Sequence, residues 1–220
     1  MKIKAVIFDL DGTLIDSMKC WENVDYNFLL ENGITPPDGI SDIMKKLSMK
    51  ESAEYFIKLG VKMKSEAITE RIEQMIHDEY AHSIPLKEYA CEILDVLDKH
   101  KIPYCVATAN YRSLTDIILK RHGIYERFKF IYTCEESGIK KDDPSFFNNI
   151  SSLMGIPPQF TAVLDDSVHC LEAAKKSGFF TVAVFDEKLN DWEQAVAIAD
   201  MSVKDFNEFS EFIVNQYCQL

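Results

Sequence analysis

The sequence of 220 residues lacks the features that mark several large classes of protein. No apolar run approaches the ~20 residues that a membrane-spanning helix needs, so we expect no membrane span. The apolar run near the N-terminus is interrupted by Asp9 and Asp11, so we expect no signal peptide. The six cysteines include no C-x-x-C pair, which favours reduced, structural thiols in a cytoplasmic protein over a disulfide framework or a zinc site. Internal repeats, low-complexity tracts and long linkers are absent as well.

Positive charge is scarce relative to negative charge. The chain has 24 Lys and Arg against 36 Asp and Glu, a formal net charge of −12 and a pI near 4.9. This balance argues against a nucleic-acid or anionic-membrane partner. It is compatible with a small anionic substrate, because a metal ion or a lysine can reverse the field at one site. Nothing in the composition indicates an obligate assembly, and we expect a monomer.

The pattern of apolar residues changes once along the chain, near residue 86. Before that point it has helical spacing, with helices predicted over 20–30, 40–47, 51–59 and 65–82 and no strand signal between 16 and 85. After it, helices and strands alternate, with strands predicted over 102–107, 128–132, 160–164 and 179–185 and an edge segment at 201–203. Such alternation implies a parallel sheet that is covered on both faces. We therefore predict an α/β fold: a Rossmann-like, doubly wound parallel sheet formed by 1–15 and 86–220, with an all-helical cap domain inserted at 16–85.

The first strand ends in two carboxylates. The segment 5–8 is apolar, as a strand buried on both faces of a sheet should be, and Asp9 and Asp11 follow it. In extended backbone, side chains i and i+2 point the same way, so the two carboxylates converge. Gly12 then permits a sharp turn. Two carboxylates aimed at one point are costly unless a cation or a reaction requires them.

Other polar residues fall at the carboxyl ends of later strands, where ligands bind to open parallel sheets. Thr108 and Asn110 follow one strand, Asp165-Asp166 follow another, and Lys140-Lys141 precede the helix that begins at Pro144. A lysine pair or a strand-end hydroxyl is often only structural when it occurs alone, so it is the combination of these residues that indicates a functional site. Together these groups suit phosphoryl transfer through an aspartyl phosphate, with a second acid as proton donor and Mg²⁺ to offset the carboxylates.

The order of these residues resembles the motifs of the haloacid dehalogenase superfamily. Asp9-Leu10-Asp11-Gly12-Thr13 resembles its first motif, Thr108 the second, Lys141 the third and Asp165-Asp166-Ser167 the fourth. The helical insertion directly after the first motif resembles the cap of the subfamily that contains β-phosphoglucomutase and phosphoglycolate phosphatase.

This resemblance implies a role for each matching residue. Asp9 would be the nucleophile and a metal ligand, and Asp11 the general acid/base and a ligand through its carbonyl. Thr108 would bind the phosphoryl group with the Ala109 amide and Asn110. Lys141 would neutralise charge, Asp166 would ligate Mg²⁺, and Asp165 would do so directly or through water.

Departures from the family pattern refine these expectations. The third motif is Lys141-Asp142-Asp143-Pro144 instead of lysine-proline-x-proline, which leaves Lys140 as an alternative, although the distance to Pro144 favours Lys141. The dehalogenases lack the second aspartate of the first motif, so Asp11 favours phosphoryl chemistry. Met49 stands where β-phosphoglucomutase has a phosphate-binding cap arginine, which weakens a mutase interpretation. Thr13 after Gly12 also fits the hydrolytic members of the family better than the mutases.

We therefore predict a Mg²⁺-dependent phosphatase that hydrolyses a small phosphate monoester, a phosphorylated metabolite, through phospho-Asp9. The alternatives are a phosphomutase and a non-catalytic protein that binds a phosphometabolite or a protein partner. If the cap closes over the site as in the resembled family, a set of cap residues would face the substrate: Cys20, Trp21, Lys45, Lys46 and Met49. The remaining candidates are expected to be surface or core residues instead: His77, His82 and His169 at the surface, and Phe128, Phe130 and Tyr132 in strand packing.

Overall fold

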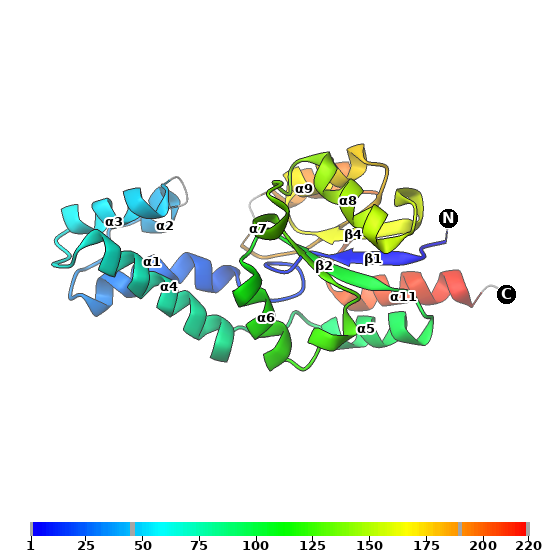
Figure 1. The fold of residues 1–220 in the computed structure, drawn as a ribbon, viewed down its shortest axis with the longest axis horizontal. Helices are drawn as coiled ribbons and strands as arrows, with labels where there is room; N and C mark the ends of the chain where they lie inside the picture. Colours follow the sequence, from blue (N-terminus) through cyan, green and yellow to red (C-terminus); the bar gives the residue numbers. More distant parts are fainter. Residues whose placement is uncertain (1, 45–46, 189–190, 219–220) are drawn as a thin grey trace. The chain divides into compact units, whose positions relative to one another are not determined.

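The computed structural model describes residues 2–44, 47–188 and 191–218 (Figure 1). The chain forms two compact units, which we call the core unit (Met1–Asp16 with Pro85–Leu220) and the helical unit (Ser17–Ile84). Within the described ranges, none of the helices has the length and apolar character required to cross a membrane. All six cysteines lie in these ranges and are free thiols.

A six-stranded parallel sheet forms the centre of the core unit. Its strands are β1 (Ala5–Phe8), β2 (Tyr104–Thr108), β3 (Ile131–Thr133), β4 (Thr161–Asp165), β5 (Phe180–Val184) and β6 (Met201–Val203). Their order is β3-β2-β1-β4-β5-β6, so the first strand lies in the middle with a neighbour on each side. The connections run outward from β1 in both directions, which confirms the predicted doubly wound α/β fold.

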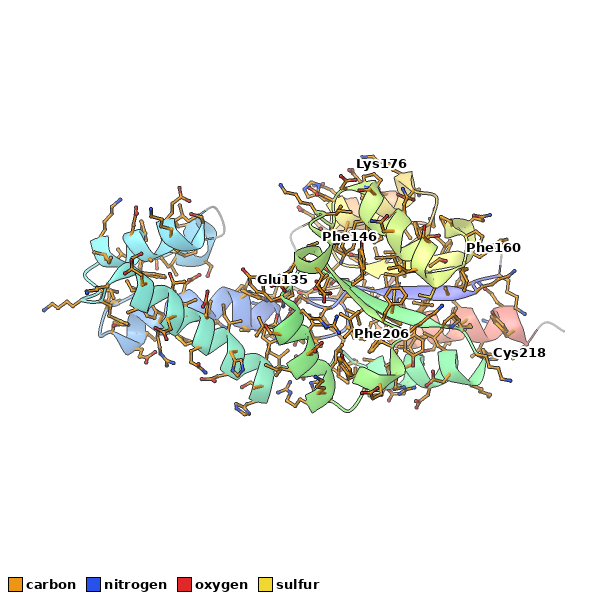
Figure 2. All side chains as sticks on the ribbon, viewed as in Figure 1. Glu135, Phe146, Phe160, Lys176, Phe206 and Cys218 are labelled. Carbon is orange, nitrogen blue, oxygen red and sulfur yellow. The ribbon has the colours of Figure 1, made fainter. Side chains whose placement is uncertain are left out.

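Every residue of β1 is apolar and buried, so side chains on both faces of the sheet pack against covering elements. Ala5 and Ile7 pack in one core cluster with Phe146 and Phe147, which lie on the helix that follows Lys141. On the other face the ring of Phe8 packs edge-on against Phe206, with centroids 5.8 Å apart. Figure 2 shows Phe146 and Phe206 on opposite sides of the sheet. The period-2 alternation of a strand produces this division.

Helices flank the sheet on both sides (Figure 1). They are α5 (Ala90–Lys99), α6 (Arg112–Arg121), α7 (Cys134–Ser137), α8 (Pro144–Met154), α9 (Val168–Lys176), α10 (Trp192–Ile198) and α11 (Phe206–Tyr217), with short 3₁₀ turns at Tyr125–Arg127 and Pro158–Phe160. Helices α8 and α9 contact each other on one side, and α5 and α11 contact each other on the other.

The third strand differs from its prediction over 128–132. It pairs with β2 only from Ile131 to Thr133, three residues in all. Phe128 lies before the strand, and its ring packs against Phe8 and Tyr104 at centroid distances of 6.5 and 5.3 Å. The apolar alternation at 128–132 therefore has two causes. Phe128 is buried before the strand begins, and the residues within the strand pair with β2.

The helical unit consists of α1 (Met18–Glu31), α2 (Ile40–Met44), α3 (Met49–Lys58) and α4 (Ser65–His82), and its described residues include no strand. Its core is built from apolar stripes, with Ile68 and Ile72 of α4 buried and the rings of Phe28 and Phe56 4.9 Å apart. Ser48 and Glu51 form a capping box at the start of α3, in which each side chain accepts from the backbone N–H of the other residue.

Candidate active site

Asp9 lies at the carboxyl end of β1 and is 7% exposed. Its N–H donates to the Leu164 carbonyl at 2.9 Å, which continues the pairing of β1 with β4 as far as the carboxylate itself. The chain then turns sharply at Gly12, whose φ of +80° is strained for other residues. The turn is closed by a hydrogen bond of 3.0 Å from the Gly12 N–H to the Ile15 carbonyl, and it leaves Asp11 half-buried.

Lys141 is the lysine that reaches the carboxylates. It is 6% exposed, its ammonium contacts Asp9 Oδ1, and it lies 2.7 Å from Asp165 Oδ2. Its neighbour Lys140 is exposed to solvent. The segment that carries both lysines ends at Asp143, whose side chain caps α8 by accepting from the Ser145 N–H at 2.8 Å.

Three carboxylates gather at this point. Asp9, Asp165 and Asp166 each offer an oxygen, and these atoms all lie within 4.8 Å of one another. The Ser167 N–H donates to Asp165 Oδ1 at 2.9 Å, and the hydroxyl of Thr13 donates to Asp166 Oδ1 at 3.3 Å. Thr13 is fully buried and was not among the predicted site residues.

The electrostatics of this cluster call for a cation. Burial raises the pKa of Asp9 to about 7, with Lys141 opposing the shift and Asp165 adding to it. Burial and the charges of Asp9 and Asp165 also raise the pKa of Asp166 well above its ordinary value. Burial alone would lower the pKa of Lys141, but the carboxylates of Asp165 and Asp9 raise it. One lysine thus faces three carboxylates, and an all-oxygen donor set of this kind fits a hard divalent ion such as Mg²⁺.

The end of β2 brings Thr108 and Asn110 to the same edge of the sheet. Thr108 is buried, and its hydroxyl oxygen accepts the Asn110 N–H at 3.0 Å. The Asn110 side-chain amide donates to Asp11 Oδ2 at 2.8 Å. Ala109 lies between them and is exposed. Sequence reasoning assigned Asn110 to the phosphoryl group and did not foresee its contact with Asp11.

The remaining candidates belong to the helical unit, fall outside the described ranges, or are exposed histidines. Within the helical unit, the Trp21 indole N–H donates to the Tyr80 hydroxyl at 3.1 Å, and Cys20 is half-buried. Lys45 and Lys46 fall outside the described residues, as does the side chain of Met49. The three histidines predicted to lie at the surface are exposed: His77, His82 and His169.

Comparison with known proteins gives a consistent picture. A family model described as "Haloacid dehalogenase-like hydrolase" matches residues 6–184. The chain is 24% identical to validoxylamine A 7'-phosphate phosphatase of Streptomyces hygroscopicus subsp. limoneus over 206 residues, which cover 93% of this chain and 95% of that protein. It is 27% identical to hexitol phosphatase A of Escherichia coli K12 over 187 residues, 84% of each chain.

A solved structure supports the same fold. The crystal structure of a putative β-phosphoglucomutase from Thermotoga maritima superposes on the whole of both chains with a TM-score of 0.84 at 21% sequence identity.

Proposed function

This chain belongs to the family of haloacid dehalogenase-like hydrolases, and we propose that it is a Mg²⁺-dependent phosphatase that hydrolyses a small phosphate monoester through a phosphoaspartate at Asp9. The observation that carries the proposal is the contact of buried Asp9 with Lys141 inside the carboxylate cluster. A carboxylate placed beside a cation at a strand end is positioned to attack an anionic phosphoryl group.

The reaction proceeds in two steps. A carboxylate oxygen of Asp9 bonds to phosphorus, while Asp11 gives a proton to the departing ester oxygen. Asp11 then takes a proton from water, whose oxygen bonds to phosphorus and releases Asp9. Lys141 and the hydroxyl of Thr108 hold the phosphoryl oxygens as charge shifts among them.

The carboxylate cluster would hold the cation. Asp9 and Asp166 would ligate Mg²⁺, with the Asp11 carbonyl as a third ligand and Asp165 acting directly or through water. The bound ion would offset the repulsion between the carboxylates and the phosphate.

The relatives guide the choice of substrate. Those cited above are named phosphatases of a phosphorylated validoxylamine and of hexitols. We therefore place the substrate among small phosphorylated sugars and polyols. The helical unit is inserted directly after the first motif, and we propose that it is a cap that selects the leaving group.

The test uses p-nitrophenyl phosphate and a panel of sugar and polyol phosphates. The parent should lose activity in EDTA and regain it with Mg²⁺, and Asp9→Asn should lose at least 10³-fold in kcat/KM. Asp142→Asn is the matched control. It makes the same change at an exposed residue next to Lys141 and should retain parental activity. Parental hydrolysis by Asp9→Asn would refute the phosphoaspartate.

The panel also separates the alternatives. A phosphatase releases inorganic phosphate in step with the dephosphorylated product. A phosphomutase would release little phosphate and would be stimulated by a sugar bisphosphate. A non-catalytic binding protein would bind a panel member tightly without turning it over.

A further inference from the structure

We propose that Asn110 is a positioning residue that aims the carboxyl group of Asp11 at the leaving oxygen of the substrate. The inference rests on the proposed phosphatase function and deepens it. Its direct observation is the hydrogen bond of 2.8 Å from the Asn110 side-chain amide to Asp11 Oδ2, which joins the loop after β2 to the loop after β1 across 99 residues of sequence.

Two further hydrogen bonds hold Asn110 itself. Its backbone N–H donates to Thr108 Oγ1 at 3.0 Å, and its side-chain oxygen accepts the Tyr111 N–H at 2.7 Å. The acceptor role of the side-chain oxygen sets the orientation of the amide, so the NH₂ group faces Asp11. A side chain fixed in this way supplies the orientation that proton transfer requires.

The loop that carries Asn110 is also anchored from outside. Directly after it, the Arg112 N–H at the start of α6 donates to the Glu135 carboxylate of α7 at 3.0 Å (Figure 2 labels Glu135). The Arg112 guanidinium donates to Asp116 at 2.7 Å and to Glu136 at 3.1 Å. The contact with Asp116 lies within α6, and those with Glu135 and Glu136 tie α6 to α7 and so to the segment that leads into Lys141.

The hydrogen bond also selects which oxygen of Asp11 does the chemistry. An amide NH₂ group only donates, so Oδ2 must accept while the bond is present. A carbonyl oxygen accepts better than the hydroxyl oxygen of a protonated carboxyl group, so this bond favours Oδ2 as the carbonyl oxygen and Oδ1 as the oxygen that carries the transferable proton. In the first step, the bond between phosphorus and the ester oxygen breaks as the Asp9–phosphorus bond forms, and the Oδ1 proton moves to the departing oxygen. In the second step, Oδ1 recovers a proton from the attacking water.

The leaving group provides a specific test. A p-nitrophenolate departs without a proton, a phenolate benefits from one, and a benzyl alkoxide requires one. We would measure kcat/KM for p-nitrophenyl, phenyl and benzyl phosphate with Mg²⁺ in the full-length protein. This ratio reports the steps up to phosphorylation of Asp9, so the later hydrolysis does not obscure the leaving-group effect.

Asn110→Ala and the near-isosteric Asn110→Leu both remove the donor, and the second variant guards against a local collapse in the first. Each should lose about 10²-fold on benzyl phosphate and less than about fivefold on p-nitrophenyl phosphate, with phenyl phosphate between them. Asp11→Asn should show the same ordering. Tyr111→Phe is the matched control, because it keeps the backbone donor to Asn110 and should match the parent on all three esters.

A uniform loss on the three esters, or no loss on any, overturns the positioning role. A uniform loss would instead assign Asn110 to phosphoryl binding or to loop structure. Asp9→Asn, measured alongside, keeps the two proposals apart. Hydrolysis retained in Asp9→Asn overturns the phosphoaspartate itself, whereas a uniform loss in the Asn110 variants with an inactive Asp9→Asn overturns only the role of Asn110.

Discussion

At the scale of single residues, the burial of Lys141 is the feature that most constrains the chemistry. A lysine is rarely buried unless it is paired, and here the partners are the carboxylates of Asp9 and Asp165. The ammonium therefore stays protonated, and it is already at the place where a phosphoryl group would have to approach Asp9. Lys140 comes directly before it but extends into solvent.

The two adjacent lysines form a natural pair of variants. Lys141→Met should lower kcat/KM for p-nitrophenyl phosphate by at least about 10²-fold, because a fixed cation beside the transferring group is lost. Lys140→Met, which removes the same charge one residue away, should stay within about twofold of the parent. Steady-state kinetics with saturating Mg²⁺ would check both, and comparable losses in the two variants would contradict the assignment.

The site residues could be anticipated to different degrees from the sequence. Asp9, Asp165 and Asp166 follow apolar strands, so their meeting at one sheet edge follows from parallel topology. The bond from Thr13 to Asp166 spans 153 residues and depends on how Gly12 turns the chain. No local pattern encodes such a pairing, and the same holds for Asn110 and Asp11. Local sequence thus indicated which groups gather at the edge, but not which hydrogen bonds orient them.

At the scale of elements, strong periodicity made the difference between correct and incorrect boundaries. Helix α4 begins at Ser65 and ends at His82, as predicted, because its apolar stripe repeats over the whole helix. Helix α7 was missed. It spans only Cys134–Ser137, too short to show a period. Its N-cap is Thr133, whose hydroxyl oxygen accepts the Glu136 N–H at 3.1 Å. A four-residue helix of this kind is fixed by its cap and by its neighbours.

Helix α1 carries a half-buried carboxyl group, that of Asp25, whose titration can be measured. Burial raises the pKa of Asp25 from 3.8 to about 6. The folded state therefore binds this proton more tightly than the unfolded state does. The stability contributed by Asp25 is complete below about pH 4, falls as the pH rises through 4 to 6, and stays at its lower value above that range.

Asp25→Asn removes this pH dependence. The melting temperature of the variant relative to the parent should rise between pH 4 and pH 7, by on the order of 3 °C, and then level off. Thermal unfolding followed by circular dichroism at several pH values would show it. Asp38→Asn, in the exposed turn before α2, controls for the loss of one negative charge. A difference that does not change with pH would contradict the role given to burial.

At the scale of the whole molecule, the chain concentrates its proposed catalytic groups in one of its two units. Asp9, Lys141 and the two later aspartates all belong to the core unit. The helices that cover both faces of the sheet also belong to the core unit, with Phe146 packed on one face and Phe206 on the other. The helical unit has a separate core around Phe28 and Phe56. The arrangement separates the proposed chemistry from the residues that we expect to choose a substrate.

The two ends at which the helical unit is inserted lie side by side in the core unit. The Asp16 N–H donates to the Pro85 carbonyl, and the Lys87 N–H donates to the Leu14 carbonyl, each at 3.0 Å. Ile15 and Leu86 form an antiparallel bridge. This pairing resembles the base of a hairpin. Pro85 has no N–H to close a two-residue turn, so a flexible Gly-Ser-Gly-Ser linker should connect Asp16 to Pro85.

A protein in which Gly-Ser-Gly-Ser replaces residues 17–84 should therefore fold, since the core unit keeps its sheet and both helical layers. We expect one cooperative thermal transition and Mg²⁺-dependent hydrolysis of p-nitrophenyl phosphate within about tenfold of the parent, because this leaving group needs little help. Its kcat/KM values for different sugar and polyol phosphates should converge, because the groups that distinguish them are gone.

Combining the deletion with Asp9→Asn should abolish the residual activity, which shows that it comes from the same site. A deleted protein that still prefers one sugar phosphate as strongly as the parent would place substrate selection in the core unit, and one that cannot fold would show that the core unit depends on its insertion.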